Sequence, residues 1–265
     1  GLRTVAELRA APVEQLLAAH ATMGSRRIAD PEGVIERHGN PLAFLSFRPV
    51  GDGRDVPADP LAAIRAGAGE GVPLLVGTNL EEWKLFALMT TPAADEGALL
   101  RRLALVAPDP ADALAAYRAE HPDAGPGDLE GAVLTDVVFR MPAVRLADAH
   151  AAHAPVFQYR FDWRSPAFGG MIGASHAVEI PFVFDLVEDH RLHVFVGPEA
   201  PARLAGAMHR AWVDFAASGA PSAPELPEWP SINGGGRPVM RFDEDSSLQF
   251  DPQAATTKYW LEADA

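Results

Sequence analysis

The stretch Val72-Pro73-Leu74-Leu75-Val76-Gly77-Thr78-Asn79-Leu80-Glu81-Glu82 decides the fold class, because it leads from a short apolar strand through a turn to two carboxylates. The apolar part has no polar alternation, which is typical of a strand buried on both faces of a parallel sheet. Active sites in open α/β sheets lie beyond the carboxyl ends of the strands, so a carboxylate here is well placed to orient a histidine. The two glutamates would also suit the start of the next helix, where negative charge complements the helix dipole, and these residues alone favour that second interpretation.

Predicted strands and helices alternate along the rest of the chain. Residues 155–161 are rich in aromatic and β-branched residues and predict a second strand. Residues 199–217 predict a helix with one apolar face. The other expected elements are helices at 4–20 with a break near Pro12, at 60–67, 94–120 and 128–150, a loop with room for one short strand at 42–60, and short strands at 238–242 and 248–250. This alternation indicates the α/β class, and no domain boundary is expected.

Composition limits the classes of function. The chain has 265 residues, of which 48% are hydrophobic, and these values predict a globular protein with a substantial core. There is no cysteine, which excludes disulfides, thiolate metal sites and a cysteine nucleophile, and slightly favours the cytoplasm over secretion. The net charge of −14 argues against nucleic acid and anionic membranes as partners. The glycine-rich segment at 233–236 lacks the context of a phosphate loop and is interpreted as a turn.

His176 is a candidate general base. It lies in a loop of small residues just before an apolar segment, and an unperturbed imidazole has a pKa of about 6.5. A solvated loop histidine is the alternative, since the chain has nine histidines. His190 and His193 are three residues apart without an evident third ligand, so no zinc site is expected.

Several stretches, taken in order, resemble the type-B carboxylesterase and cholinesterase family of α/β-hydrolases. Residues 73–82 resemble the strand and turn that present the acid, and residues 173–184 (Gly-Ala-Ser-His-Ala-Val-Glu-Ile-Pro-Phe-Val-Phe) resemble the histidine loop. The other matching stretches are 49–57 ahead of the acid strand, 157–163 before the histidine loop, and 212–216 with Gly219, Pro221, Trp229 and Pro230 near the end. The resemblance covers nearly the whole chain and implies an α/β-hydrolase fold with Glu82 as triad acid and His176 as base.

The nucleophile that this resemblance implies is not in the sequence. A nucleophile elbow reads G-x-S-x-G, and none of the nine serines has glycines at that spacing. The triad order in α/β-hydrolases is serine, acid, histidine, so the serine and the oxyanion loop are expected upstream. The chain also lacks an initiator methionine. Residues 1–265 are therefore expected to be the C-terminal portion of one carboxylesterase domain, complete at its C-terminal end, whose N-terminal half is missing.

The resemblance implies an ester substrate and no metal or cofactor, and two alternatives stay open. One is a non-catalytic, cholinesterase-like interaction module, and the other is an inactive stand-alone fragment. An upstream G-x-S-x-G would support the enzyme, G-x-G-x-G the interaction module, and a stop codon the fragment. Members of the family that this chain resembles usually have a glycine after the triad glutamate, where this chain has Trp83. The tryptophan either lines the active site or packs under the next helix. Phe139, Met141 and Phe182 are further candidates for pocket lining, with core packing favoured for Phe182.

Overall fold

The computed structural model describes residues 3–28, 33, 49–232 and 236–263. Contacts divide the chain into two compact units, Gly1–Val50 and Gly51–Ala265, and each is described by itself. We expected no boundary, so this division is a difference from the sequence analysis. The residues that follow Val50 are rich in glycine and proline, a composition typical of linkers. Residues 42–48 of the expected loop at 42–60, and most of the turn at 233–236, lie outside the described residues.

Residues 3–28 of the first unit form the helices α1 (Val5–Ala10) and α2 (Val13–Ile28). Thr4 and Glu7 form a capping box at the start of α1: the Glu7 N–H donates to Thr4 Oγ1 at 3.1 Å, and the Thr4 N–H donates to Glu7 Oε2 at 3.2 Å. The chain leaves the helix between Ala10 and Val13, which confirms the predicted break near Pro12.

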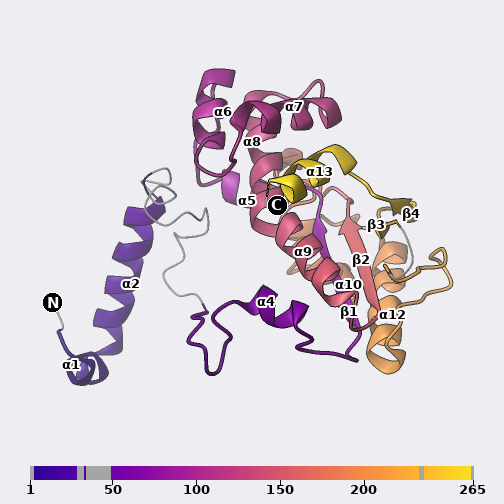
Figure 1. Ribbon diagram of the computed structural model, residues 1–265, viewed down its shortest axis with the longest axis horizontal. Helices are drawn as coiled ribbons and strands as arrows, with labels where there is room; N and C mark the ends of the chain where they lie inside the picture. The colour runs from indigo at the N-terminus through magenta and orange to yellow at the C-terminus, as the bar shows by residue number, and fades with distance from the viewer. Residues whose placement is uncertain (1–2, 29–32, 34–48, 233–235, 264–265) are drawn as a thin grey trace. The chain divides into compact units, whose positions relative to one another are not determined.

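The second unit is built on a four-stranded sheet in the order β1-β2-β3-β4 (Figure 1). The strands are β1 (Leu74–Asn79), β2 (Val156–Phe161), β3 (Pro238–Phe242) and β4 (Ser247–Phe250). The first three are parallel, and β4 is antiparallel to β3. The predicted mostly parallel sheet with flanking helices is confirmed. The apolar run predicts a strand at 72–77, whereas β1 spans Leu74–Asn79. It continues past Gly77 because Thr78 and Asn79 pair with Arg160 and Phe161 of β2 instead of forming a turn.

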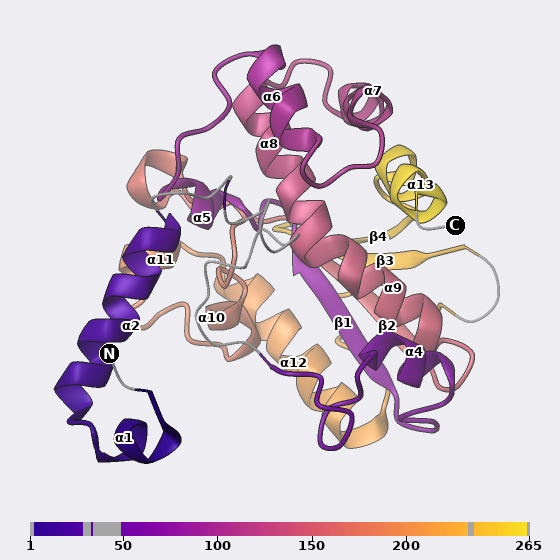
Figure 2. The same ribbon diagram turned by 60° about the vertical axis from the view of Figure 1, so that its left-hand side comes forward.

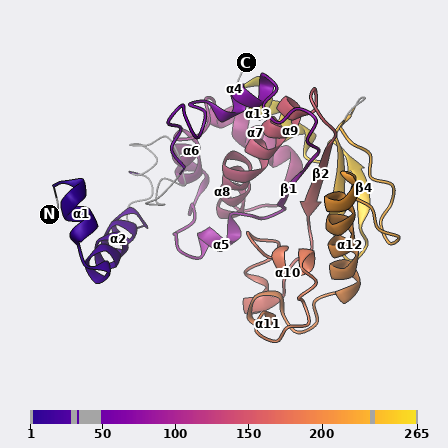
Figure 3. The same ribbon diagram turned by 90° about the horizontal axis from the view of Figure 1, so that it is seen from below.

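Helices surround this sheet. α9 (Met141–His150) contacts β1 and β2, while α12 (Ala202–Ser218) packs its buried Leu204 and Met208 into a core with Phe157 and Phe161. Figure 3 shows the segment between β2 and α12, which carries two short helices, α10 (Ile180–Val183) and α11 (His193–Val196). This unit also contains α4 (Pro60–Arg65), α5 (Lys84–Ala87) and a 3₁₀ turn at Ala167–Gly170. A further helix, α13 (Ala254–Glu262), was not predicted from the sequence.

The predicted helix at 94–120 is two helices, α6 (Glu96–Leu103) and α7 (Pro110–Glu120). Pro108 and Pro110 break the run, and Asp109 caps α7 by accepting from the N–H groups of Ala111 and Asp112, both at 3.0 Å. The expectation of one helix was wrong because the local cap outweighs the continuing apolar spacing.

The predicted helix at 128–150 is continuous but not α-helical throughout (Figure 2). α8 (Pro126–Thr135) passes into a π-helical segment (Asp136–Arg140) and then into α9. The Met141 N–H donates to the carbonyl five residues back, at Asp136. Pro142 follows directly and has no N–H to give to the carbonyl four residues before it, which favours a wider turn here.

β1 is an edge strand of the described sheet, and this changes its burial. The sequence predicts burial on both faces, whereas residues 74–78 are half-buried and only Asn79 is fully buried. Among the described residues, no strand pairs with one long side of β1, and an unpaired strand edge is an aggregation hazard.

The 265-residue chain is expected to self-associate or to melt without a sharp transition, because this edge is apolar. Light scattering at rising concentration, together with urea melts, measures both properties. A lysine at Val76 of β1 is expected to reduce self-association, because a charge on an edge strand blocks further pairing. The matched control is Val213→Lys on the exposed side of α12. A monodisperse monomer with one cooperative transition would contradict this prediction.

Candidate active site

Glu82 lies in the turn between β1 and α5, which we call the acid turn (Leu80–Trp83). The Asn79 N–H donates to Glu82 Oε1 at 2.7 Å, and the Trp83 N–H donates to Thr135 Oγ1 at 3.0 Å. These bonds hold the turn at the carboxyl end of β1 and bury Glu82, which is 5% exposed. The two glutamates thus precede α5 instead of starting it.

His176 lies in the histidine loop (Gly173–Glu179), which follows β2 and runs beside the acid turn. The Glu81 N–H donates to the Ala174 carbonyl at 2.9 Å, and the His176 N–H donates to the Glu82 carbonyl at 3.3 Å. The backbone therefore joins two segments that are far apart in the sequence.

The two predicted site residues are in contact. His176 Nδ1 lies 2.7 Å from Glu82 Oε2, and the histidine side chain is 45% exposed while that of Glu82 is 7% exposed. The hydrogen bond with Glu82 raises the pKa of His176 against the opposing effect of partial burial, and the charges of Glu82 and Glu179 add to the increase. A buried carboxylate on Nδ1 orients the imidazole and leaves Nε2 for proton transfer.

Two phenylalanines pack against the imidazole. The ring centroids of Phe86 and Phe139 lie 5.4 Å and 5.0 Å from that of His176, and 5.9 Å from each other. The structure thus places Phe139 at the site, as the sequence analysis allowed. Phe86, four residues after Glu82, was not among the site residues predicted from the sequence.

The other candidate lining residues are buried. Trp83 is 7% exposed and packs against Phe86 at 5.1 Å, which favours packing under the helix. Met141 and Phe182 are fully buried, each in a different core. Ser175, next to His176, is fully buried as well.

Asn79 and Glu179 form a polar group behind the pair, and the sequence analysis missed both. Asn79 Nδ2 donates to the Ser175 carbonyl at 2.7 Å and to Glu179 Oε2 at 2.5 Å. Burial raises the pKa of Glu179, and the hydrogen bond from Asn79 only partly offsets this. The position of Asn79, a polar residue after a continuous apolar run, was a signal that could have identified it.

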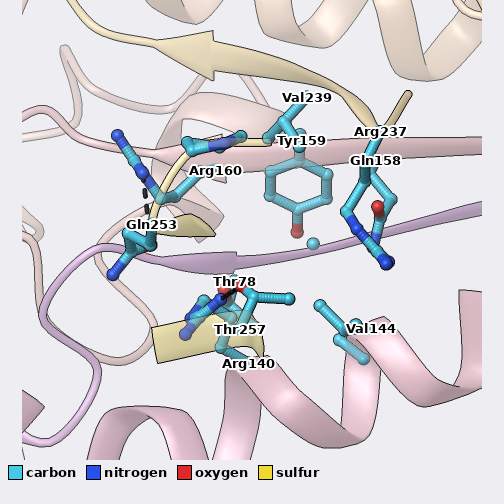
Figure 4. A pocket seen from close by; sticks show the side chains of 13 residues that line it. Thr78, Arg140, Val144, Gln158, Tyr159, Arg160, Arg237, Val239, Gln253 and Thr257 are labelled. Atoms are coloured by element: carbon cyan, nitrogen blue, oxygen red, sulfur yellow. Dashed lines mark hydrogen bonds between the residues drawn. The ribbon is translucent and has the colours of Figure 1, made fainter. Parts of the chain in front are cut away.

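A cavity lies between the sheet and the helix that contains Arg140 and Val144 (Figure 4). Its three arginines each pair with an aspartate: Arg140 with Asp136, Arg160 with Asp162 and Arg237 with Asp148. The cavity has room for only about two or three water molecules, which is less than a small-molecule ester occupies.

In the part of the chain that the structure describes, no three or more histidine, aspartate or glutamate side chains are grouped to hold a metal ion. None of the helices in this part has the length and apolar character needed to span a bilayer.

Comparison with known proteins assigns the chain to a family. The model of the carboxylesterase family matches residues 3–260. The para-nitrobenzyl esterase of Bacillus subtilis is 31% identical over 239 residues, which is 86% of this chain and 44% of the relative. The phenmedipham hydrolase of Pseudarthrobacter oxydans is 30% identical over 218 residues, covering 78% of this chain and 42% of the relative.

Solved structures agree with this assignment. A para-nitrobenzyl esterase structure matches 96% of this chain and 49% of its own with a TM-score of 0.74 at 28% identity. A carboxylesterase of Geobacillus stearothermophilus matches 91% of this chain and 54% of its own with a TM-score of 0.71 at 30% identity. The chain thus spans about half the length of the relatives that it matches. From the match of the family model along nearly its whole length, we conclude that this chain belongs to the carboxylesterase family.

Proposed function

We propose that this chain supplies the acid and the base of a serine carboxylesterase, with Glu82 and His176 as two members of a Ser-His-Glu triad. The observation that carries the proposal is the 2.7 Å contact between His176 Nδ1 and the buried carboxylate of Glu82. The nucleophile and the oxyanion hole are expected in a segment upstream, since no serine of this chain lies in a G-x-S-x-G elbow.

The proposed reaction is acyl transfer to the serine followed by hydrolysis. His176 Nε2 takes the proton of the serine as its oxygen attacks the ester carbonyl, and then gives that proton to the departing alcohol. Water releases the acid in a second round of the same proton transfers. Glu82 holds the ring and stabilises the imidazolium that forms in each round. The substrate is a small-molecule carboxylic ester, consistent with the family.

The exposed fractions of the two side chains support these roles. A base must reach the substrate, and 45% of the His176 side chain is exposed. An orienting carboxylate acts most strongly where water is excluded, and Glu82 is buried. The raised pKa of His176 favours the cationic form that the ring takes during each proton transfer.

The 265-residue chain alone is expected to hydrolyse an activated ester such as p-nitrophenyl acetate only at the rate of its histidines, because the nucleophile and oxyanion donors lie elsewhere. The measurement is pre-steady-state kinetics with labelling by a fluorophosphonate. A burst of p-nitrophenol together with a labelled serine in this chain would contradict the assignment.

In the complementary experiment, a longer form of the protein is expressed from the reading frame extended upstream of Gly1. The longer form is expected to show the burst and to be labelled at a serine upstream of Gly1, and His176→Ala is expected to abolish both. A longer form that is folded, carries G-x-S-x-G and still lacks esterase activity would refute the proposed function.

A further inference from the structure

Glu81 joins three segments of the second unit through one carboxylate. Its Oε2 accepts the backbone N–H of Ala174 in the histidine loop at 3.0 Å and Arg164 Nε at 3.1 Å. Its Oε1 lies 2.8 Å from Lys84 Nζ, at the start of α5. The carboxylate therefore connects the acid turn, the histidine loop and the segment that follows β2.

The side chain of Glu81 reinforces a backbone contact at the same place. The Glu81 N–H donates to the Ala174 carbonyl, so Glu81 and Ala174 exchange two hydrogen bonds, at 2.9 Å and 3.0 Å. One residue further on, the Glu82 carbonyl accepts the N–H of His176 at 3.3 Å, a longer bond. The side chain of Glu81 thus supplies one of the two hydrogen bonds that join Glu81 to Ala174.

The backbone at Gly173 lies so close to the carboxylate of Glu81 that there is no room for a side chain. The φ of Gly173 is +55°, and a Cβ built there would lie 2.3 Å from Glu81 Oε2. Any other residue would have to displace the carboxylate or the loop. Because the clash is with the oxygen that accepts from Ala174, the loop conformation and the carboxylate position require each other.

The carboxylate is ionised and held by cations. Burial alone would raise the pKa of Glu81, but the bonds from Lys84, the Ala174 N–H and Arg164 lower it overall. Its side chain is 19% exposed, whereas that of Arg164 is 62% exposed. The buried part of the arrangement is thus the bond to the histidine loop, and the ion pair with Arg164 lies at the surface, where such pairs contribute little.

We propose that Glu81 is the positioning residue of the proposed active site, and that its carboxylate clamps the histidine loop to the acid turn and thereby sets the contact of His176 with Glu82. The proposal rests on the proposed function for the role of that contact, but not for its geometry. Glu81 touches no reacting atom and acts only through His176. The two glutamates of the acid turn thus have different roles. Glu82 binds the imidazole of His176, and Glu81 holds the histidine loop in place.

The test is an NMR titration of His176 in the 265-residue chain, or in the longer form if the chain self-associates. Glu81→Leu removes both the charge and the acceptor, whereas Glu81→Gln removes the charge but keeps an oxygen for the Ala174 N–H. Arg164→Met removes one ion pair and leaves the carboxylate. Glu82→Gln defines the full loss of the Glu82 contribution, and Glu199→Ala, at an exposed position, is the matched control.

Glu81→Leu is expected to lower the pKa of His176 by at least about half as much as Glu82→Gln lowers it, because a displaced imidazole ring loses its hydrogen bond with Glu82. Glu81→Gln, Arg164→Met and Glu199→Ala are expected to leave that pKa nearly unchanged. Glu179 also raises the pKa of His176, but all these variants except Glu82→Gln keep both acidic neighbours. A Leu variant with the wild-type His176 pKa, or a Gln variant as low as the Leu variant, would overturn the proposal.

If Glu81→Leu does not fold, Gly173→Ala tests the same contact from the histidine loop, since the new Cβ would displace the carboxylate of Glu81. It is expected to lower the His176 pKa as well, and a folded Gly173→Ala with an unchanged pKa would refute the clamp. The titration needs no esterase activity. Failure of the positioning role is therefore distinguishable from failure of the proposed function, which is judged by the longer form.

Discussion

His176→Ala is expected to lower kcat on the order of 10⁵-fold in a form of the protein that carries the upstream nucleophile, because it removes the proposed base that takes the serine proton. The ring of His176 is fixed by Glu82 on Nδ1 and by Phe86 and Phe139 beside it, so a water molecule does not replace it in the same geometry. KM is expected to change little, because the imidazole acts mainly in the transition state. Steady-state kinetics on an activated ester measures both constants.

Glu82→Gln is expected to lower kcat roughly tenfold to a hundredfold less than His176→Ala, since it removes orientation and charge support but leaves the base. The pH profile of kcat/KM gives a second readout. Because Glu82 raises the pKa of His176, the active, neutral imidazole forms only at higher pH. Glu82→Gln is therefore expected to shift the rising limb of this profile to lower pH. Glu81→Gln is the neighbouring control and is expected to be mild, because its amide oxygen still accepts the Ala174 N–H. A Glu81→Gln variant more damaging than Glu82→Gln would mean that the acid is the preceding residue.

Asp136→Ala is expected to destabilise the second unit by about 3–5 kcal/mol, because it leaves the guanidinium of Arg140 buried without its partner. Asp136 accepts from Arg140 Nε and Nη2 and from the Tyr117 hydroxyl, each at 2.5 Å, and its side chain is 1% exposed. Urea melts measure the loss. Hydrogen exchange should rise first in α13, because Arg140 also donates to Thr256 and Thr257 of that helix.

The double variant Asp136→Leu with Arg140→Met is expected to recover most of this stability, since removing both charges avoids the cost of an isolated one. Asp55→Ala is the matched control, because the Arg54–Asp55 pair is exposed at 86% and 75% and no change in the melt is expected. Equal losses for the single and the double variant would show that the pair itself stabilises the fold.

Local patterns predicted which segments are strands, and they also predicted where β2, β3 and β4 end, but not where β1 ends. β1 was expected to stop at Gly77 because its apolar run stops there, yet Thr78 and Asn79 continue the ladder with β2. Pairing with a distant strand thus decided the end, and local sequence does not contain that information. The boundary between α6 and α7, in contrast, was readable from Pro108, Asp109 and Pro110, and was missed only because the apolar spacing was given more weight.

The site was predictable to a different degree. The residues themselves favoured a helix start for Glu81 and Glu82, and it was the resemblance to a family that singled out Glu82 and His176. Their contact is in the structure, and their catalytic role stays a prediction. Asn79 and Phe86 lie within a few residues of Glu82, but their contacts with the histidine loop depend on long-range packing that no local pattern encodes.

The π-helical segment at Asp136–Arg140 has a consequence for insertions and deletions along the helix from Pro126 to His150. A π-helical turn holds one residue more than an α-helical turn, so a single deletion inside this segment would leave an ordinary α-helix with α9 still facing the sheet. A deletion elsewhere in α8 or α9 would turn the following residues by about 100° and move their apolar side chains away from the core. A one-residue deletion in this helix is thus expected to be tolerated best in the segment that carries Phe139 and Arg140. Such a deletion variant is expected to keep the fold but to lose the position of the Phe139 ring beside His176.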